Sequence, residues 1–163
     1  MSRIPISIQG YESVKKELDE LKKERPGVIQ AIKEAREEGD LKENAGYDAA
    51  RERQGMLEAR ISHIESRMPY FDLIDLDKQN SDEILFGATV EIEDMETEEV
   101  KKYTLLGADE ADYKNGTISI MSPVAQALLG KMEGDEIVVD APRGKIEYEI
   151  ISVKYEGAAA VKR

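Results

Sequence analysis

The chain of 163 residues has no cysteine and no tryptophan, and it has one histidine and two phenylalanines. Without cysteine there is no disulfide, thiolate nucleophile or cysteine metal site, and one histidine with no cysteine argues against the usual catalytic triads. The sequence also lacks a glycine-rich phosphate loop and an apolar run of membrane-spanning length, and its first residues lack the apolar core of a secretory signal. These absences predict a cytoplasmic protein without a conventional catalytic centre.

Clustered basic charge is also scarce. The formal net charge is -12, from 23 basic and 35 acidic side chains, and most of the excess acid lies in the second half. This balance argues against a protein that wraps duplex DNA, because phosphate binding is driven by clustered Lys and Arg. One local basic group remains, formed by Arg36, Lys42, Arg51 and Arg53. It could attract a few phosphates, or it could be an ordinary solvated helix face.

Two stretches of apolar residues step by threes and fours, the pattern of amphipathic helices that pack along a seam. The helices are expected over about residues 11–38 and 43–68, and Ser7 marks the entry to the first of them. Pro26 should bend or locally break the first helix. The seam residues are Val14, Leu18, Leu21, Val28, Ile32 and Ala35, then Tyr47, Ala50, Gln54, Leu57, Ile61, Ile64 and Met68, with Arg25 interrupting the first series. A short connection makes such helices antiparallel, which predicts a coiled-coil hairpin arm over residues 1–75.

After a polar linker at residues 76–83, the apolar period changes to two. Strands are expected at 88–93, 101–105, 117–120, 136–139 and 146–153. Ser122 followed by Pro123 marks the start of one short helix, which ends near Gly130. The fold class is therefore α+β: an N-terminal antiparallel α-helical hairpin and a C-terminal antiparallel β domain over residues 84–156. Residues 157–163 are expected to be a frayed tail.

Two carboxylates, Asp40 and Glu43, stand three residues apart in the connection between the helices. One interpretation is local: Asp40 caps the second helix and Glu43 reaches back, a variant of the capping box. The other is chemical: carboxylates at the end of a rigid arm can be delivered into a cavity, where Mg²⁺ takes oxygen ligands. Two carboxylates cannot hold Mg²⁺ tightly, so catalysis would need a partner that supplies another metal and the substrate. The two roles are compatible.

The tip segment 34–45, with Tyr47 and residues 49–52, resembles the tip of the GreA and GreB transcript cleavage factors of bacteria. Segments 84–90, 107–112, 122–123 and 129–131 resemble the family's globular domain, which is FKBP-like. The likeness covers nearly the whole chain. The modest basic cluster and the acidic total resemble GreA more than GreB. Two positions depart from the family: Gly46 stands where many members carry Glu, and Asp48 where an enteric-type GreA has His.

The resemblance implies a transcription elongation factor that is not itself an enzyme. It would bind RNA polymerase through the globular domain, insert its coiled coil into the secondary channel and stimulate cleavage of the 3′ end of backtracked RNA. Asp40 and Glu43 would position Mg²⁺ shared with the polymerase active site, with no cofactor bound stably. The partners implied are the polymerase and the nascent RNA, with no membrane, and the factor is expected to be a monomer.

The resemblance also implies roles for further side chains. Arg36, Lys42, Arg51 and Arg53 would lie near the RNA, Asn44 and Tyr47 would support the tip, and Ser122 and Pro123 would contact the polymerase. Three alternatives stay open. An anti-cleavage paralogue would occupy the same channel but carry a more acidic tip. A coiled-coil chaperone would tolerate Asp40→Asn, and an FKBP-like prolyl isomerase would need an aromatic-lined pocket.

Overall fold

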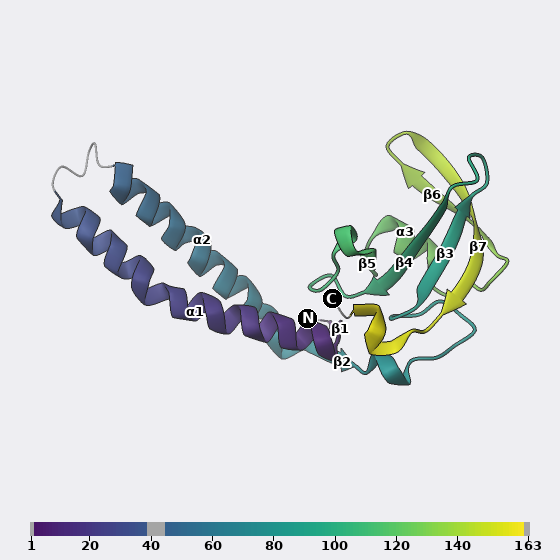
Figure 1. Ribbon diagram of the computed structural model, residues 1–163, viewed down its shortest axis with the longest axis horizontal. Coiled ribbons are helices and arrows are strands. Elements are labelled where there is room, and N and C mark those ends of the chain that lie inside the picture. The colour runs from purple at the N-terminus through teal and green to yellow at the C-terminus, as the bar shows by residue number, and fades with distance from the viewer. Residues whose placement is uncertain (1, 39–44, 162–163) are drawn as a thin grey trace. The chain divides into compact units, whose positions relative to one another are not determined.

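The computed structural model describes residues 2–38 and 45–161 (Figure 1). Residues 13–70 form one compact unit, the arm, and the described residues before and after them form a second, the β unit. The sequence placed residues 1–75 in the arm. In the structure, strand β1 (Ile4–Ser7) pairs in parallel with strand β2 (Phe71–Ile74), and both strands belong to the β unit.

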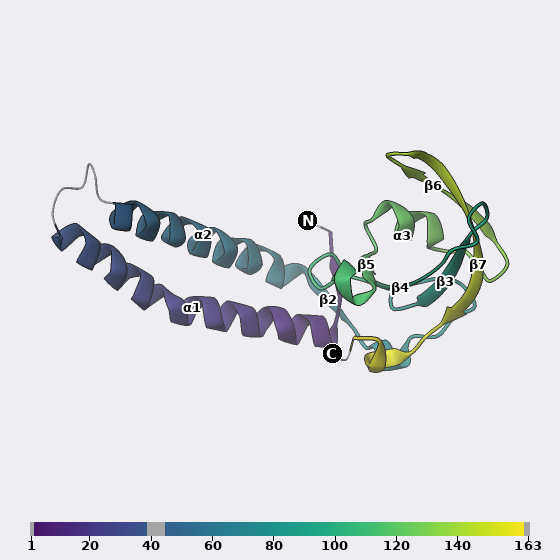
Figure 2. The ribbon, with the colours of Figure 1, turned by 45° about the horizontal axis from the view of Figure 1, so that its top comes forward.

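The arm consists of two antiparallel helices, α1 (Ile8–Glu37) and α2 (Ala45–Arg67), which run side by side in Figures 1 and 2. The entry expected at Ser7 is confirmed, because its hydroxyl oxygen accepts the backbone N–H of Gly10 at 2.9 Å. The predicted seam forms the core of the arm. Its buried members are Val14, Leu18, Val28, Ile32, Ala35, Leu57, Ile61 and Ile64.

The middle of the arm contains three residues that disfavour helix. Helix α1 continues unbroken through Pro26, and its axis curves in Figure 2. Proline costs about 3 kcal/mol and glycine about 1 kcal/mol relative to alanine in a helix interior. Gly27 follows the proline, and Gly55 lies within α2. A Cβ at either glycine would meet no atom within 4 Å, so crowding does not explain either glycine.

The β unit is built on a five-stranded sheet in the order β5-β4-β3-β7-β6. The strands are β3 (Thr89–Asp94), β4 (Val100–Leu106), β5 (Thr117–Ser119), β6 (Glu136–Ala141) and β7 (Gly144–Lys154). All five lie where the period of two predicted them, and the expected fold class is confirmed. The pairing of β4 with β5 is parallel, unlike the other pairs in this sheet, and this was not predicted.

The predicted short helix is α3 (Pro123–Leu128), with Ser122 as its N-cap. Its side chains Ala125 and Leu128 are fully buried and join the main core of the sheet with Val90, Ile92 and Leu105. The helix therefore covers one face of the sheet, as the sequence indicated.

The tail was expected to be frayed, but its described residues form regular structure. Residues Gly157–Val161 form a 3-10 helix, and the backbone N–H of Ala158 donates to Asp77 at 2.8 Å. Val161 packs on a second apolar cluster formed by Leu76, Phe86 and Leu106. The local sequence gave no sign of this contact, because its partners lie far away along the chain. No helix within residues 2–38 and 45–161 is both long and apolar enough to cross a membrane.

Candidate functional site

The candidate site is the distal end of the arm, where α1 ends at Glu37 and α2 begins at Ala45. Four of the residues assigned to it by sequence, Asp40, Lys42, Glu43 and Asn44, lie outside the described residues. The capping and metal-binding interpretations of the two carboxylates therefore both stay predictions. The described residues on either side define the frame that presents them.

Arg36 and Tyr47 meet across the two helices at this end. The Arg36 guanidinium carbon lies 5.9 Å from the centre of the Tyr47 ring, within the range of a cation–π contact. Arg36 is in the last turn of α1, where a positive charge also interacts favourably with the helix dipole. Tyr47 is half-buried. The sequence proposed both residues for the tip but did not predict that they contact each other.

The departure at Asp48 has a local structural explanation. Asp48 lies in the first turn of α2, where a negative charge is favourable near the unpaired backbone N–H groups. It is exposed, as is Gly46. Asp48 can therefore stabilise the start of α2 without any role in binding a metal.

The other two described arginines of the basic group are exposed on α2. The Arg51 guanidinium donates to the Gln54 side-chain oxygen at 3.4 Å. Arg53 lines a shallow hollow of about 380 Å³ on the flank of the arm, together with Leu21, Glu24 and Met56. The structure therefore places Arg53 beside acidic and apolar side chains of the arm, and Arg36 against Tyr47.

Ion pairs between the helices hold the arm in register. Arg25, the polar residue in the α1 seam, donates through two nitrogens to the two carboxylate oxygens of Glu58, both at 2.8 Å. Arg60 binds Glu17 in the same bidentate manner at 2.7 and 2.9 Å. Lys22 pairs with Glu65 at 2.9 Å. Arg25 stands out in the sequence as a polar seam residue, but its partner does not, because Glu58 lies beside the α2 seam and not in it.

These pairs predict that the arm loses stability in acid. The hydrogen bond from Arg60 lowers the pKa of Glu17, and the hydrogen bond from Arg25 lowers the pKa of Glu58. A lowered folded-state pKa gives stability that is full above the unfolded-state value and is lost as pH falls through the folded-state value. We expect the melting temperature of the helices, followed by circular dichroism, to fall between about pH 5 and about pH 3. The double variant Glu17→Gln, Glu58→Gln should fall less over this range, and an equal fall would contradict the assignment.

In the β unit, the two residues proposed to contact a polymerase differ in their availability. The Ser122 hydroxyl accepts the backbone N–H of Ala125 at 3.3 Å and donates to the Ser119 carbonyl oxygen at 2.7 Å. Ser122 is half-buried and caps α3, whereas Pro123 is exposed. Pro123 is therefore the better placed of the two for contact with a partner.

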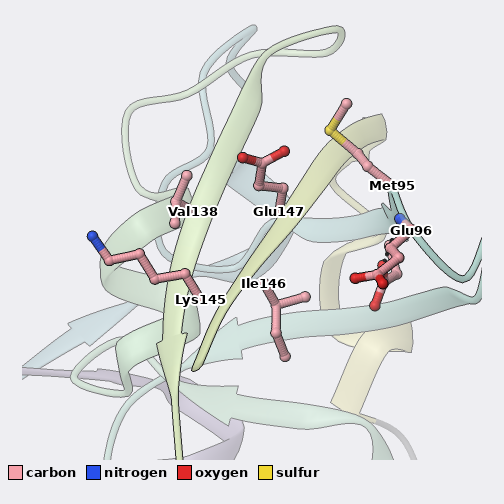
Figure 3. Close-up of a pocket in the computed structure, with 7 residues that line it drawn as sticks. Met95, Glu96, Val138, Lys145, Ile146 and Glu147 are labelled. Atoms are coloured by element: carbon pink, nitrogen blue, oxygen red, sulfur yellow. Dashed lines mark hydrogen bonds between the residues drawn. The ribbon is translucent and has the colours of Figure 1, made fainter. Parts of the chain in front are cut away.

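An open hollow of about 780 Å³ lies between the turn after β3 and the hairpin of β6 and β7 (Figure 3). Met95 and Glu96 stand on one side of it and Val138 and Lys145 on the other. Its lining is Asp94, Met95, Glu96, Val138, Lys145, Ile146 and Glu147. None of these is aromatic, so this hollow does not match the pocket that a prolyl isomerase would need. Across the described part of the chain, no three His, Cys, Asp or Glu side chains are grouped to hold a metal.

Both parts of the chain match a known family. Residues 78–155 match the family described as transcription elongation factor GreA/GreB, C-terminal, and residues 4–72 match the transcription elongation factor N-terminal family. The chain belongs to the GreA/GreB family of transcription elongation factors. The resemblance inferred from the tip motif and the globular segments is thus confirmed.

Relatives of this family cover nearly the full length of the chain. A protein of Nitratidesulfovibrio vulgaris strain Miyazaki F is 73% identical over 97% of this chain and 99% of its own length. A protein of Solidesulfovibrio magneticus is 66% identical over 98% of each chain, and one of Halorhodospira halophila is 54% identical over 96% of this chain and 100% of its own. All three are named transcription elongation factor GreA, which agrees with the expected similarity to GreA.

Among solved structures, GreA factor homolog 1 of Thermus thermophilus is 25% identical. The match covers 93% of this chain and 99% of that one, with a TM-score of 0.44. The family assignment rests on the sequence matches.

Proposed function

We propose that this factor stimulates RNA polymerase to cleave the 3′ end of backtracked RNA. The observation that carries the proposal is the position of Asp40 and Glu43, in the connection between two long antiparallel helices that are joined near their ends by Arg36 and Tyr47. Helix α1 has 30 residues and is therefore about 45 Å long. An arm of this length can carry the two carboxylates deep into a channel. In this proposal that channel is the secondary channel of the polymerase, which leads to its active site.

The chemistry of the tip side chains fits a metal that is shared with the polymerase. Mg²⁺ prefers carboxylate oxygens and keeps several waters, so Asp40 and Glu43 are suitable ligands that still need a partner to complete the site. When bound, the ion would supply an activated water and neutralise developing charge on the phosphate. The polymerase provides the substrate and the remaining ligands, so the factor acts in trans.

Neighbouring side chains of the arm would guide the RNA and hold the tip. Arg36 and Arg51 are exposed on the two helices, and Lys42 is adjacent to the carboxylates in sequence. Their positive charges would attract the phosphates of the extruded RNA. Tyr47, under Arg36, would support the tip as a packing residue. On the β unit, exposed Pro123 would take part in docking to the polymerase.

The alternative within the family is inhibition without cleavage. By resemblance to anti-cleavage paralogues, a tip that occupies the channel without promoting cleavage would carry more acidic side chains than a cleavage tip. Here the position of Gly46 lacks the acid that many members carry, while Asp40 and Glu43 are present. This composition favours cleavage.

The test uses halted, backtracked bacterial RNA polymerase with end-labelled RNA and Mg²⁺. Addition of the factor should accelerate release of the 3′ fragment by at least about tenfold. This is a small factor compared with the rate enhancements that are typical of enzymes. Labelled RNA without polymerase should stay intact, because the factor does not supply the whole site. Blocked elongation without cleavage would instead support the inhibitor.

A further inference from the structure

The middle of the arm combines three residues that disfavour helix with a bidentate ion pair between the two helices. Arg25 contacts Glu58, and further along the arm Arg36 contacts Tyr47. The cross-helix pairs of the arm, whose long side chains reach a turn or more along the helices, place Gly27 roughly level with Gly55. Pro26 adjoins Gly27, so all three helix-weakening residues lie at one level of the arm, the level of the Arg25–Glu58 pair.

The local packing does not require glycine at position 27 or 55. A Cβ at Gly27 or Gly55 would meet no atom within 4 Å, and neither glycine has a positive φ. Alanine would fit both positions and would stiffen both helices. Pro26 removes the donor for the carbonyl four residues earlier and so weakens α1 at the same level. Residues that disfavour the secondary structure in which they lie, and for which there is no steric reason, are typical of functional positions.

The seam is also interrupted here. Arg25 occupies a seam position of α1. The seam residues before and after it, Leu21 and Val28, are both apolar. An apolar residue would pack at this point, whereas Arg25 makes a bidentate contact whose planar geometry fixes direction as well as distance. Polar residues at such positions cost stability and specify alignment.

We propose that Arg25 and Glu58 are positioning residues, whose ion pair clamps a flexible joint formed by Pro26, Gly27 and Gly55 and so fixes where the distal arm presents Asp40 and Glu43. The joint lets the arm adjust to a channel, and the clamp limits this adjustment. The functional part of this inference rests on the proposed cleavage activity. The mechanical part concerns residues 13–70 alone and stands independently.

The mechanical part is tested by the distance between two spin labels on the full chain. The chain has no cysteine, so cysteines introduced at exposed Lys16 and Glu37 label α1 on both sides of the joint. The labelled positions lie about 30 Å apart along the helix. The parent should give one narrow distance distribution, and Arg25→Met a broad one. The charge-swapped double variant Arg25→Glu, Glu58→Arg should make the distance distribution narrow again. Adding Gly27→Ala and Gly55→Ala to Arg25→Met should have the same effect.

Arg60→Met is the matched control. It removes an equally bidentate and similarly exposed pair, with Glu17, that lies nearer the base of the arm and away from the glycines. This variant should leave the distribution narrow. An unchanged distribution in Arg25→Met, or an equal broadening in Arg60→Met, would overturn the clamp.

The functional part is read from cleavage of backtracked RNA at saturating factor. Misplacement of a reacting group by about 1 Å can cost up to 100-fold, and we expect Arg25→Met to lower the cleavage rate about tenfold. Its melting temperature should fall only slightly, because the lost ion pair joins two half-exposed side chains and methionine is a good helix former at an apolar seam. The two glycine substitutions should restore most of the rate. Broadening without loss of cleavage would refute the positioning role, and an inactive parent would refute the proposed function while the label distances still decide the clamp.

Discussion

Replacement of Asp40 by Asn, or of Glu43 by Gln, is expected to lower the stimulated cleavage rate by about 100-fold at saturating factor. Each change keeps the shape of the side chain and removes one negative charge. A neutral amide is a poorer ligand for Mg²⁺ than a carboxylate, so the shared ion would lose much of its occupancy. The rate is measured on backtracked complexes with end-labelled RNA. Binding to immobilised polymerase, measured in parallel, should be unchanged.

The same variants separate metal positioning from helix capping. Asparagine caps a helix as well as aspartate does, so a capping role for Asp40 predicts full activity in Asp40→Asn. Asp48→Asn is the matched control, because Asp48 is an exposed acid in the first turn of α2 and is close to the tip in sequence. Its effect on the cleavage rate should be about twofold or less, the size of a helix-dipole effect. Equal losses in Asp40→Asn and Asp48→Asn would show that general tip charge, and not a metal ligand, matters.

Local periodicity was sufficient to predict the elements. Steps of three and four gave α1 and α2, and alternation gave the five strands of the main sheet. These signals work because each helix or strand buries one face, and the buried face leaves a pattern in the sequence. Ser7 and Ser122 were found as helix caps for a similar reason, because a cap acts within three residues of its own position.

Long-range pairings could not be predicted in this way. Strands β1 and β2 have four residues each and are too short for a clear alternation, and their parallel pairing joins distant parts of the chain. The contact of Val161 with its apolar cluster also joins residues that are far apart in the sequence. Within the candidate site, sequence supplied Arg36 and Tyr47 as separate candidates, but their contact depends on the register of the arm. That register is set partly by Arg25 and Glu58, whose pairing has no local signature.

One such long-range contact gives the second large expected effect, on the stability of the β unit. The Glu110 carboxylate accepts the backbone N–H of Ser7 at 2.8 Å and that of Gly107 at 3.0 Å, and it also accepts the Ser7 hydroxyl. Ser7 is fully buried, and its hydroxyl oxygen accepts the N–H of Gly10. One carboxylate therefore satisfies three donors at the point where β1 leads into α1.

Glu110→Ala is expected to lower the free energy of unfolding of the β unit by about 4 kcal/mol, because each buried donor left without an acceptor costs about 1–3 kcal/mol. Glu110→Gln should cost less, about 1–2 kcal/mol, since one amide oxygen can still accept both backbone N–H groups while its NH₂ faces the Ser7 hydroxyl. Urea unfolding followed by near-ultraviolet circular dichroism of buried Tyr103 and Tyr148 reports on this unit. Asp82→Ala, at an exposed bend, is the control and should change the value by less than about 0.5 kcal/mol.

Gly107→Ala should be at least as damaging, for a steric reason. A Cβ at Gly107 would overlap the carbonyl oxygen of Pro5 and press on the Glu110 carboxylate at 3.1 Å. The Pro5 oxygen belongs to the backbone of β1, so the strand would have to move away and the three hydrogen bonds to Glu110 would lengthen together. Since both substitutions break the same contact, the double variant Gly107→Ala, Glu110→Ala should be destabilised by less than the sum of the two single effects. Full additivity would show that Gly107 and Glu110 act on separate parts of the β unit.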